Sequence, residues 1–250
     1  MSSEDWQRRV LVIPAAGRGS RLGASVPKAL VEVAGRPMIG WLIALYRPWV
    51  SGVVLVAHPT TRDAIRAAVQ QYDLPSEVVI QAEPTGMLDA VLLGCVAAAR
   101  WSPERIWITW CDQIAIHADT VARLADREGE SSIALPLITR ESPYIHFDRA
   151  ADGRIAAVRQ RREGHVMPAR GDSDMGLFSL SARAAMVDLP AFAASATADA
   201  GTGERNFLPF IPVAATHGSV VTIPATDDIE AVGVNTPEEL ARVEAHLKSR

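Results

Sequence analysis

One short segment, residues 15–21 with the sequence Ala-Ala-Gly-Arg-Gly-Ser-Arg, has residue types and spacing that suit phosphate binding. It follows the apolar run 10–13, which predicts a buried strand, so the segment leaves the carboxyl end of that strand. Open α/β sheets bind their ligands at this end. The two glycines allow a tight turn that brings backbone N–H groups against a phosphate, and the serine, the last arginine and Lys28 add a hydroxyl group and two cations. We therefore predict a polyphosphate-binding loop.

Two common phosphate-binding motifs do not match this segment. A Rossmann dinucleotide motif needs Gly-x-Gly-x-x-Gly that runs directly into a helix. Here Gly17, Gly19 and Gly23 are spaced differently, and Pro27 blocks a helix. A Walker A loop needs Gly-Lys-Ser/Thr, which the sequence lacks. A tight connection without a ligand remains the alternative interpretation.

The longer pattern resembles a specific enzyme family. Ala-Ala-Gly-x-Gly-Ser-Arg is followed by Pro27-Lys28, an apolar run and Ala-Gly-Arg-Pro-Met at 34–38. This resembles the sugar-1-phosphate nucleotidyltransferases of the MobA-like NTP transferase superfamily, and most closely the uridylyltransferase half of the bifunctional N-acetylglucosamine-1-phosphate enzyme. The resemblance covers about residues 10–247, so we expect no acetyltransferase domain in this chain. It implies that the residues contacting the nucleotide phosphates are Ala15, Ala16, Gly17, Gly19, Ser20, Arg21 and Lys28.

An acid and an amide are candidates for a metal site. Asp112 follows the apolar run 105–110, and a carboxylate beyond a strand end can hold Mg²⁺ against phosphate oxygens. Asn235 precedes the start of the last predicted helix. Either residue could instead be a turn or cap residue. The resemblance implies that Asp112, which follows Cys111 where the family has glycine, and Asn235 are the two protein ligands of the metal.

A second loop is a candidate for recognising the base. Residues 81–87 read Gln-Ala-Glu-Pro-Thr-Gly-Met and resemble the family's Gln-x-x-x-x-Gly-Thr, whose Gln and Gly contact the uracil edge. The resemblance assigns this role to Gln81 and Gly86. A side-chain amide both donates and accepts, which suits an imide-like edge. Met87 replaces the usual threonine, and a plain helix-entry loop is the alternative.

The acceptor-binding pattern is less complete. The family uses a Tyr-Gly pair, a glutamate and an asparagine before Thr-Gly, and the best matches are Tyr144, Gln160 and Asp174. Ile145 stands in place of the glycine, and the other two matches also change chemistry. Arginines at 159, 161 and 162 could hold an acceptor phosphate, although such a run is more often a solvated face.

The elements that position these residues indicate a doubly wound α/β fold. Apolar runs alternate with helical segments up to about residue 130, which is typical of a parallel sheet covered on both faces. Strands are expected at 10–13, 53–57, 78–80 and 105–110, and helices at 60–72, 87–100 and 119–128. Further strands at 133–138, 144–149, 155–160 and 176–180 have no helix between them and predict an antiparallel insertion.

The remaining segments complete one expected domain. We expect a mobile lid at 161–173, a loose surface connection at 191–203, a last strand at 219–223 and a final helix capped by Thr236. The fold class is therefore α/β, with a Rossmann-like, mostly parallel sheet and an inserted antiparallel β region, as in the nucleotide-diphospho-sugar transferase fold. We divide this single domain, 1–250, into a nucleotide-binding half at about 1–130, an acceptor-binding insertion at about 131–190 and a closing part at about 191–250.

The composition excludes several classes of protein. A net charge of −4 over 250 residues argues against nucleic-acid binding, so phosphates must be bound by a local cluster of cations. Cys95 and Cys111 have no paired spacing and are expected to be buried and free. No apolar run approaches the length of a membrane span, and we expect a cytoplasmic protein with no membrane partner. The sequence leaves a homo-oligomer open.

The resulting hypothesis is a Mg²⁺-dependent nucleotidyl transfer. The phosphate of a small acceptor, a sugar 1-phosphate by resemblance, attacks the α-phosphorus of a nucleoside triphosphate, UTP by resemblance, and pyrophosphate leaves. A phosphate dianion needs no general base, so catalysis requires alignment and charge neutralisation. The alternatives are a cytidylyltransferase for a non-sugar phosphate or phosphonate, a nucleotide-binding regulatory protein without turnover, and an interaction module.

Overall fold

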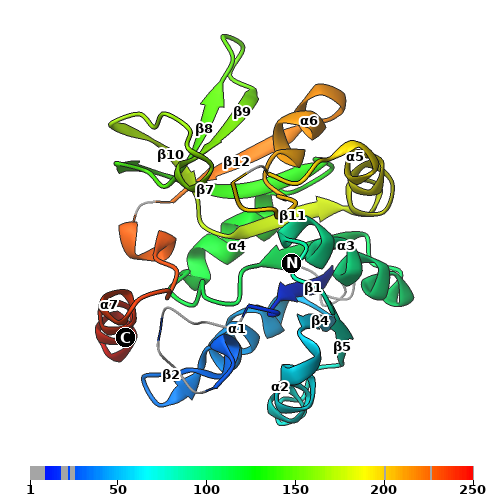
Figure 1. Cartoon of the computed structure of the whole chain (residues 1–250), viewed down its shortest axis with the longest axis vertical. Helices are drawn as coiled ribbons and strands as arrows, with labels where there is room; N and C mark the ends of the chain where they lie inside the picture. The colour runs from blue at the N-terminus through cyan, green and yellow to red at the C-terminus, as the bar shows by residue number, and fades with distance from the viewer. Residues whose placement is uncertain (1–8, 18–21, 23–25, 200, 226, 250) are drawn as a thin grey trace.

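The computed structural model of the protein describes residues 9–17, 22, 26–199, 201–225 and 227–249 (Figure 1). Of the predicted phosphate-binding residues, Gly19, Ser20 and Arg21 lie outside the described residues, and so does the intervening Arg18. Phosphate binding by Gly19, Ser20 and Arg21 therefore stays a prediction. The described part of the loop is residues 15–17, at the carboxyl end of the first strand.

A parallel sheet forms the first half of the fold. Strand β1 (Arg9–Pro14) pairs in parallel with β4 (Gly52–Ala57) on one side and with β6 (Arg105–Thr109) on the other, and β5 (Ser76–Ile80) pairs in parallel with β4. Every residue of β1, β4 and β6 is buried. Covered strands of this kind read as continuous apolar runs, which is why the sequence revealed them.

The insertion extends the same sheet with antiparallel strands. The sheet has the order β10-β7-β11-β6-β1-β4-β5, and β12 pairs in parallel with β7. The added strands are β7 (Ile133–Glu141), β10 (Arg170–Asp174), β11 (Leu177–Ser181) and β12 (Val220–Pro224). Two smaller antiparallel ribbons are β2 (Glu32–Val33) with β3 (Arg36–Pro37), and β8 (Ile145–Arg149) with β9 (Ile155–Gln160). This arrangement confirms the predicted fold class.

Helices cover both faces of the sheet, because alternate residues of its strands point to opposite sides. Leu11 and Ile13 belong to one apolar cluster, whereas Val10 and Val12 belong to the other. The helices of the first face are α1 (Met38–Tyr46), α2 (Arg62–Val69), α4 (Ala118–Arg127) and α7 (Pro237–Lys248). Those of the second face are α3 (Met87–Ala98), α5 (Leu189–Ser195) and α6 (Phe210–His217). The protein is thus a three-layer α/β domain (Figure 1).

Local signals at the ends of elements behave as expected. Thr236 caps α7 in a capping box with Glu239, and Pro237 occupies the first turn.

A buried cluster forms at the amino ends of the central strands, where Glu128 accepts hydrogen bonds from Arg9 at 2.6 Å and from the Trp107 indole at 2.8 Å. Both cysteines are buried and free, as predicted.

Two predicted irregular segments contain regular structure. Within the lid expected at 161–173, β10 begins at Arg170 and pairs along β7. Its sequence, Arg-Gly-Asp-Ser-Asp, has low β propensity, so tertiary pairing overrides local preference. Within the surface connection expected at 191–203, α5 continues to Ser195 because its Ala-rich sequence packs an apolar side on the core.

No helix among the described residues is long and apolar enough to cross a membrane.

Strands β10 and β11 act as two halves of one interrupted strand beside β7. Leu177 pairs with Thr109 on β6, whereas Asp174, three residues earlier, pairs with β7 and has no partner on β6. The break falls at Gly176, whose φ of +67° suits glycine and whose carbonyl accepts a hydrogen bond from the Trp110 backbone N–H at 3.0 Å. Asp112, just beyond β6, and Asp174, at the end of β10, line the same cavity beside this break.

Candidate active site

Three predicted site residues from distant parts of the sequence meet at one point. The Lys28 ammonium lies 2.5 Å from Asp112 Oδ2 and 2.7 Å from Asn235 Oδ1. Lys28 begins a short 3-10 turn, Asp112 follows β6, and Asn235 precedes α7. The Lys28 and Asp112 side chains are only 12% and 14% exposed. The two oxygen atoms therefore converge on one cation, largely shielded from solvent.

Backbone contacts hold the two oxygen donors in place. The Val234 N–H donates to the Asp112 carbonyl at 3.1 Å, which joins the two segments. The Asn235 side-chain N–H donates to the Gly233 carbonyl at 3.1 Å, so its oxygen faces Lys28. Glu239 accepts a hydrogen bond from the Asn235 backbone N–H at 2.8 Å as part of the helix cap. The cap of α7 thus also holds the backbone of Asn235.

The donor chemistry fits a hard divalent cation. One carboxylate and one amide oxygen are ligands that Mg²⁺ accepts, and Mg²⁺ usually takes its remaining ligands from water and substrate phosphates. Among the described residues, no group of three or more His, Cys, Asp and Glu side chains could hold a metal ion by itself. A metal at Asp112 and Asn235 would therefore take its remaining ligands from water and a phosphorylated ligand.

The predicted base loop is shaped by its own hydrogen bonds. The Gln81 side-chain N–H donates to the Gly86 carbonyl at 3.0 Å, which leaves the Gln81 carbonyl oxygen to accept from a ligand. Gly86 has a φ of +119°, and a Cβ there would collide with the Arg205 backbone. Arg205 flanks this loop through its backbone, donating to the Thr85 carbonyl at 2.8 Å and accepting from the Leu88 N–H at 3.0 Å.

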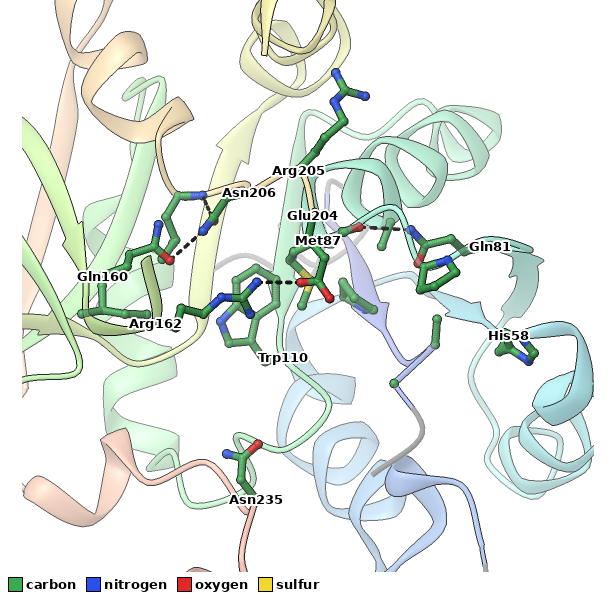
Figure 2. A pocket seen from close by; sticks show the side chains of 18 of the residues that line it. His58, Gln81, Met87, Trp110, Gln160, Arg162, Glu204, Arg205, Asn206 and Asn235 are labelled. Carbon is green, nitrogen blue, oxygen red and sulfur yellow. Dashed lines mark hydrogen bonds and ion pairs between the residues drawn. The ribbon is translucent and has the colours of Figure 1, made fainter. Parts of the chain in front are cut away.

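A cavity of about 370 Å³ connects this loop to the inserted strands. Figure 2 shows Gln81 and His58 on one side of it, Gln160 and Asn206 on the other, and Trp110 between them. Ala16 and Gly17 of the predicted phosphate loop and Asn235 of the three-residue cluster also line it. The described part of the phosphate loop, the base loop and the acceptor-side residues therefore share one space.

The three predicted acceptor residues occupy different positions. Tyr144 is 52% exposed and lines this cavity, as does the buried Gln160. Asp174 instead lines a second cavity of about 380 Å³, which shares Trp110, Tyr144 and Asn235 with the first. Burial raises the pKa of Asp174 to about 6, and the charge of Asp112 adds to this rise.

The arginine run contributes one residue to the cavity. Arg159 pairs with Asp148 at 2.6 Å, and Arg161 donates to the backbone carbonyls of Ser142 and Pro143. Arg162 lines the cavity and pairs with Glu204 at 2.6 Å, in front of Trp110 (Figure 2).

Sequence reasoning missed residues 204–206, which lie between α5 and α6 and form one wall of the cavity. Glu204 pairs with Arg162, Arg205 pairs with Asp89 and also contacts the base loop through its backbone, and Asn206 donates to Gln160. A short polar run after an Ala-rich stretch carries no recognisable motif. The apolar sequence that follows it offered no signal of a binding wall either.

Comparison with known families matches residues 11–173 to the MobA-like NTP transferase domain. Among curated relatives, the bifunctional protein GlmU of Acidiphilium cryptum is 30% identical over 243 residues, which cover 96% of this chain and 53% of that protein. The bifunctional protein GlmU of Azotobacter vinelandii is 30% identical over 246 residues, covering 96% of this chain and 52% of its own length. The chain spans about half the length of the curated relatives it matches.

The family match covers the phosphate loop, the base loop, the Asp112 strand end and most of the insertion, which are also the segments that meet at the cavity. The relatives extend the similarity over nearly the whole chain, including the segment that carries Asn235. The predicted family resemblance is confirmed. This chain belongs to the MobA-like NTP transferase family.

Proposed function

We propose that the protein transfers a nucleoside monophosphate from UTP to a sugar 1-phosphate with release of pyrophosphate. The observation that supports this most is the meeting of Lys28, Asp112 and Asn235 beside a cavity that reaches both the base loop and the insertion. Two substrates bound at the two ends of one cavity would have their reacting phosphates near this cluster. The matched family, described as the MobA-like NTP transferase domain, is consistent with a transferase.

The residues of this chain would act by alignment and charge neutralisation. The acceptor phosphate carries two negative charges near neutral pH and attacks the α-phosphorus without a general base, and the bond to pyrophosphate breaks. Lys28 would neutralise the phosphates during transfer, and Arg21 would hold the leaving pyrophosphate. The backbone amides of the phosphate loop would bind the same group. The partly shielded position of Lys28 strengthens its electrostatic effect.

Asp112 and Asn235 would hold Mg²⁺, whose chemistry is to withdraw charge from the phosphate oxygens. In the structure their oxygens instead contact the Lys28 ammonium. Lys28 would therefore have to leave these oxygens to reach the phosphates. The lysine would serve as counter-ion to the carboxylate before the metal binds.

Preference for UTP is proposed from the Gln81 carbonyl oxygen. The two side-chain N–H groups of Gln81 face the Gly86 carbonyl and the Thr85 hydroxyl within the loop, which leaves the carbonyl oxygen to accept a hydrogen bond from the base, and uracil offers an imide N–H. Cytosine also offers a donor in its amino group. Pyrophosphate release measured with UTP and with CTP distinguishes the two bases.

A cytidylyltransferase for a non-sugar phosphate or phosphonate is the second candidate. The observation in its favour is the acceptor end of the cavity, where Trp110 and Ile145 supply apolar surface. A sugar presents many hydroxyl groups, which apolar side chains do not satisfy. An acceptor with fewer hydroxyl groups would suit that wall.

The direct test measures pyrophosphate release with Mg²⁺ for UTP, CTP, GTP, ATP and dTTP. Each nucleotide is paired with a pool of sugar 1-phosphates and with a pool of non-sugar phosphates and phosphonates. Asp112→Asn and Lys28→Met should each reduce turnover at least about 100-fold, as losses of charge-stabilising groups do. The exposed Asp152→Asn variant is the control and should keep wild-type turnover.

The outcomes separate the candidates. Release with sugar 1-phosphates and UTP supports the proposal, and release only with CTP and the other pool favours the second candidate. Turnover that survives Asp112→Asn and Lys28→Met would contradict the assigned roles. No release with any pair would contradict the proposed reaction for these acceptors.

A further inference from the structure

Asn206 connects the closing part of the chain to the acceptor side of the cavity. Its side-chain N–H group donates to Gln160 Oε1 at 2.6 Å and to Glu163 Oε1 at 2.6 Å (Figure 2 draws the contact with Gln160). Gln160 ends β9 and Glu163 lies in the turn that follows it. Both Gln160 and Asn206 line the cavity.

The orientation of the Asn206 amide is determined by its neighbours. The Leu208 backbone N–H, which can only donate, contacts Asn206 Oδ1 at 3.0 Å. The Glu163 carboxylate, which accepts when ionised, contacts the other end of the same amide. Asn206 must therefore present its nitrogen to Gln160 and Glu163.

This orientation fixes the amide of Gln160 in turn. Because Asn206 supplies an N–H, Gln160 must face it with Oε1. The Gln160 nitrogen then has no hydrogen-bond partner among the described residues, although it is buried and the residue is only 3% exposed. A buried N–H without a partner is unfavourable and unusual in native proteins. Such a group in the wall of a substrate cavity points to a partner that comes with the substrate.

We propose that Asn206 is a positioning residue of the acceptor site, which orients Gln160 so that its side-chain N–H is left to bind an oxygen of the acceptor substrate. This rests on the proposed function. The acceptor must then offer a lone pair at this position, as a hydroxyl, carbonyl, carboxylate or phosphoryl oxygen does. An ammonium group, which can only donate, does not fit there.

A double variant can reverse the orientation of the Gln160 amide while it keeps every hydrogen bond of this cluster. In the double variant Asn206→Asp with Glu163→Gln, the new carboxylate accepts from the Leu208 N–H, from the new amide and from Gln160. Gln160 must then turn its nitrogen toward position 206, and its carbonyl oxygen takes the place of the free N–H. The single change Glu163→Gln is the matched control, because the new amide can still accept from Asn206.

Steady-state kinetics with UTP and N-acetylglucosamine 1-phosphate, glucose 1-phosphate or phosphocholine test the proposal. The double variant should raise the KM for the acceptor about 10- to 100-fold, because one hydrogen bond is replaced by two facing acceptor atoms. The KM for UTP should stay within about twofold, and the control should stay near wild type in both. An acceptor KM equal to that of wild type in the double variant would overturn the proposal. If Asn206 only stabilised the structure, the double variant would preserve that role, because it keeps the hydrogen bonds of the cluster.

A second measurement does not depend on turnover. Side-chain ¹⁵N–¹H signals of Gln160 are identified by their loss in Gln160→Glu and followed in wild type and in the double variant. In the double variant these protons should shift downfield, because they donate to a carboxylate. Unchanged signals would overturn the assigned orientation. If wild type releases no pyrophosphate with these pairs, the proposed reaction fails for them, while the signals still decide the role of Asn206.

Discussion

Asp174 should make the stability of this protein depend on pH in an unusual direction. Asp174 lies at the break between β10 and β11 and is 8% exposed. Its Oδ1 accepts a hydrogen bond from the Gly176 N–H at 2.8 Å. Burial disfavours the charged carboxylate, and the nearby charge of Asp112 disfavours it further, so the pKa is raised from 3.8 to about 6. Asp174→Asn removes the ionisation and keeps an oxygen for Gly176.

The magnitude and sign follow from the two pKa values. Below pH 3.8 the carboxyl group is protonated in both the folded and the unfolded chain, so its full contribution to stability is present. As the pH rises toward 6, Asp174 ionises in the unfolded chain while the folded protein still holds the proton. The unfolded state is therefore stabilised relative to the folded state. The difference between 3.8 and about 6 corresponds to at most about 3 kcal/mol, lost between about pH 4 and 6.

Urea unfolding of wild type and Asp174→Asn at half-unit steps from pH 3.5 to 7.5 measures this. The unfolding free energy of wild type minus that of the variant should fall by about 2 to 3 kcal/mol over the range and level off above about pH 6.5. Asp152→Asn is the matched control, because a hydrogen bond from Arg154 lowers the pKa of this exposed acid and gives a dependence of opposite sign. A constant difference between wild type and Asp174→Asn would refute the reasoning.

Three further predictions concern a glycine, a cation and a buried acid. Gly86→Ala should lower the melting temperature more than Gly153→Ala does, because both glycines have positive φ but only Gly86 faces backbone that a Cβ would strike; equal shifts in thermal unfolding would contradict this. Lys28→Met should raise the affinity for Mn²⁺ without nucleotide by on the order of tenfold, since the ammonium no longer competes for the two oxygens; unchanged binding by electron paramagnetic resonance would argue against a shared position. Glu128→Gln should lower the urea-unfolding free energy by about 3 kcal/mol, because it leaves buried arginine charge uncompensated; a loss below 1 kcal/mol would count against that account.

The sequence predicted the parallel half of the fold well because burial on both faces forces continuous apolar strands. The runs at 53–57 and 105–110 match β4 and β6 within about one residue at each end. β10 could not be found in this way, because its Gly, Asp and Ser residues form a strand only when paired with β7. Its strand character is a property of the assembled sheet.

The residues of the candidate site also differ in whether a local sequence pattern marks them. Lys28, Asp112 and Asn235 could be nominated because each stands at the end or start of an element with a clear local signature, and the fold brings them together. Their roles in catalysis stay predictions. Asn206 could not be nominated, because its importance arises from contacts with Gln160 and Glu163, more than 40 residues away in the chain. Such contacts have no counterpart in a local motif.

The position of residues 204–206 implies that the two ends of the cavity are not independent. The Arg205 backbone is hydrogen-bonded to both sides of Gly86, while the neighbouring Asn206 side chain holds the turn after β9. Adjacent residues cannot move separately by more than the backbone between them allows. A substitution that displaces this segment to admit a different acceptor should therefore also shift the base loop. Base preference and acceptor preference are expected to change together in variants of residues 204–206, even though the two groups of contacts lie on opposite sides of Trp110 (Figure 2).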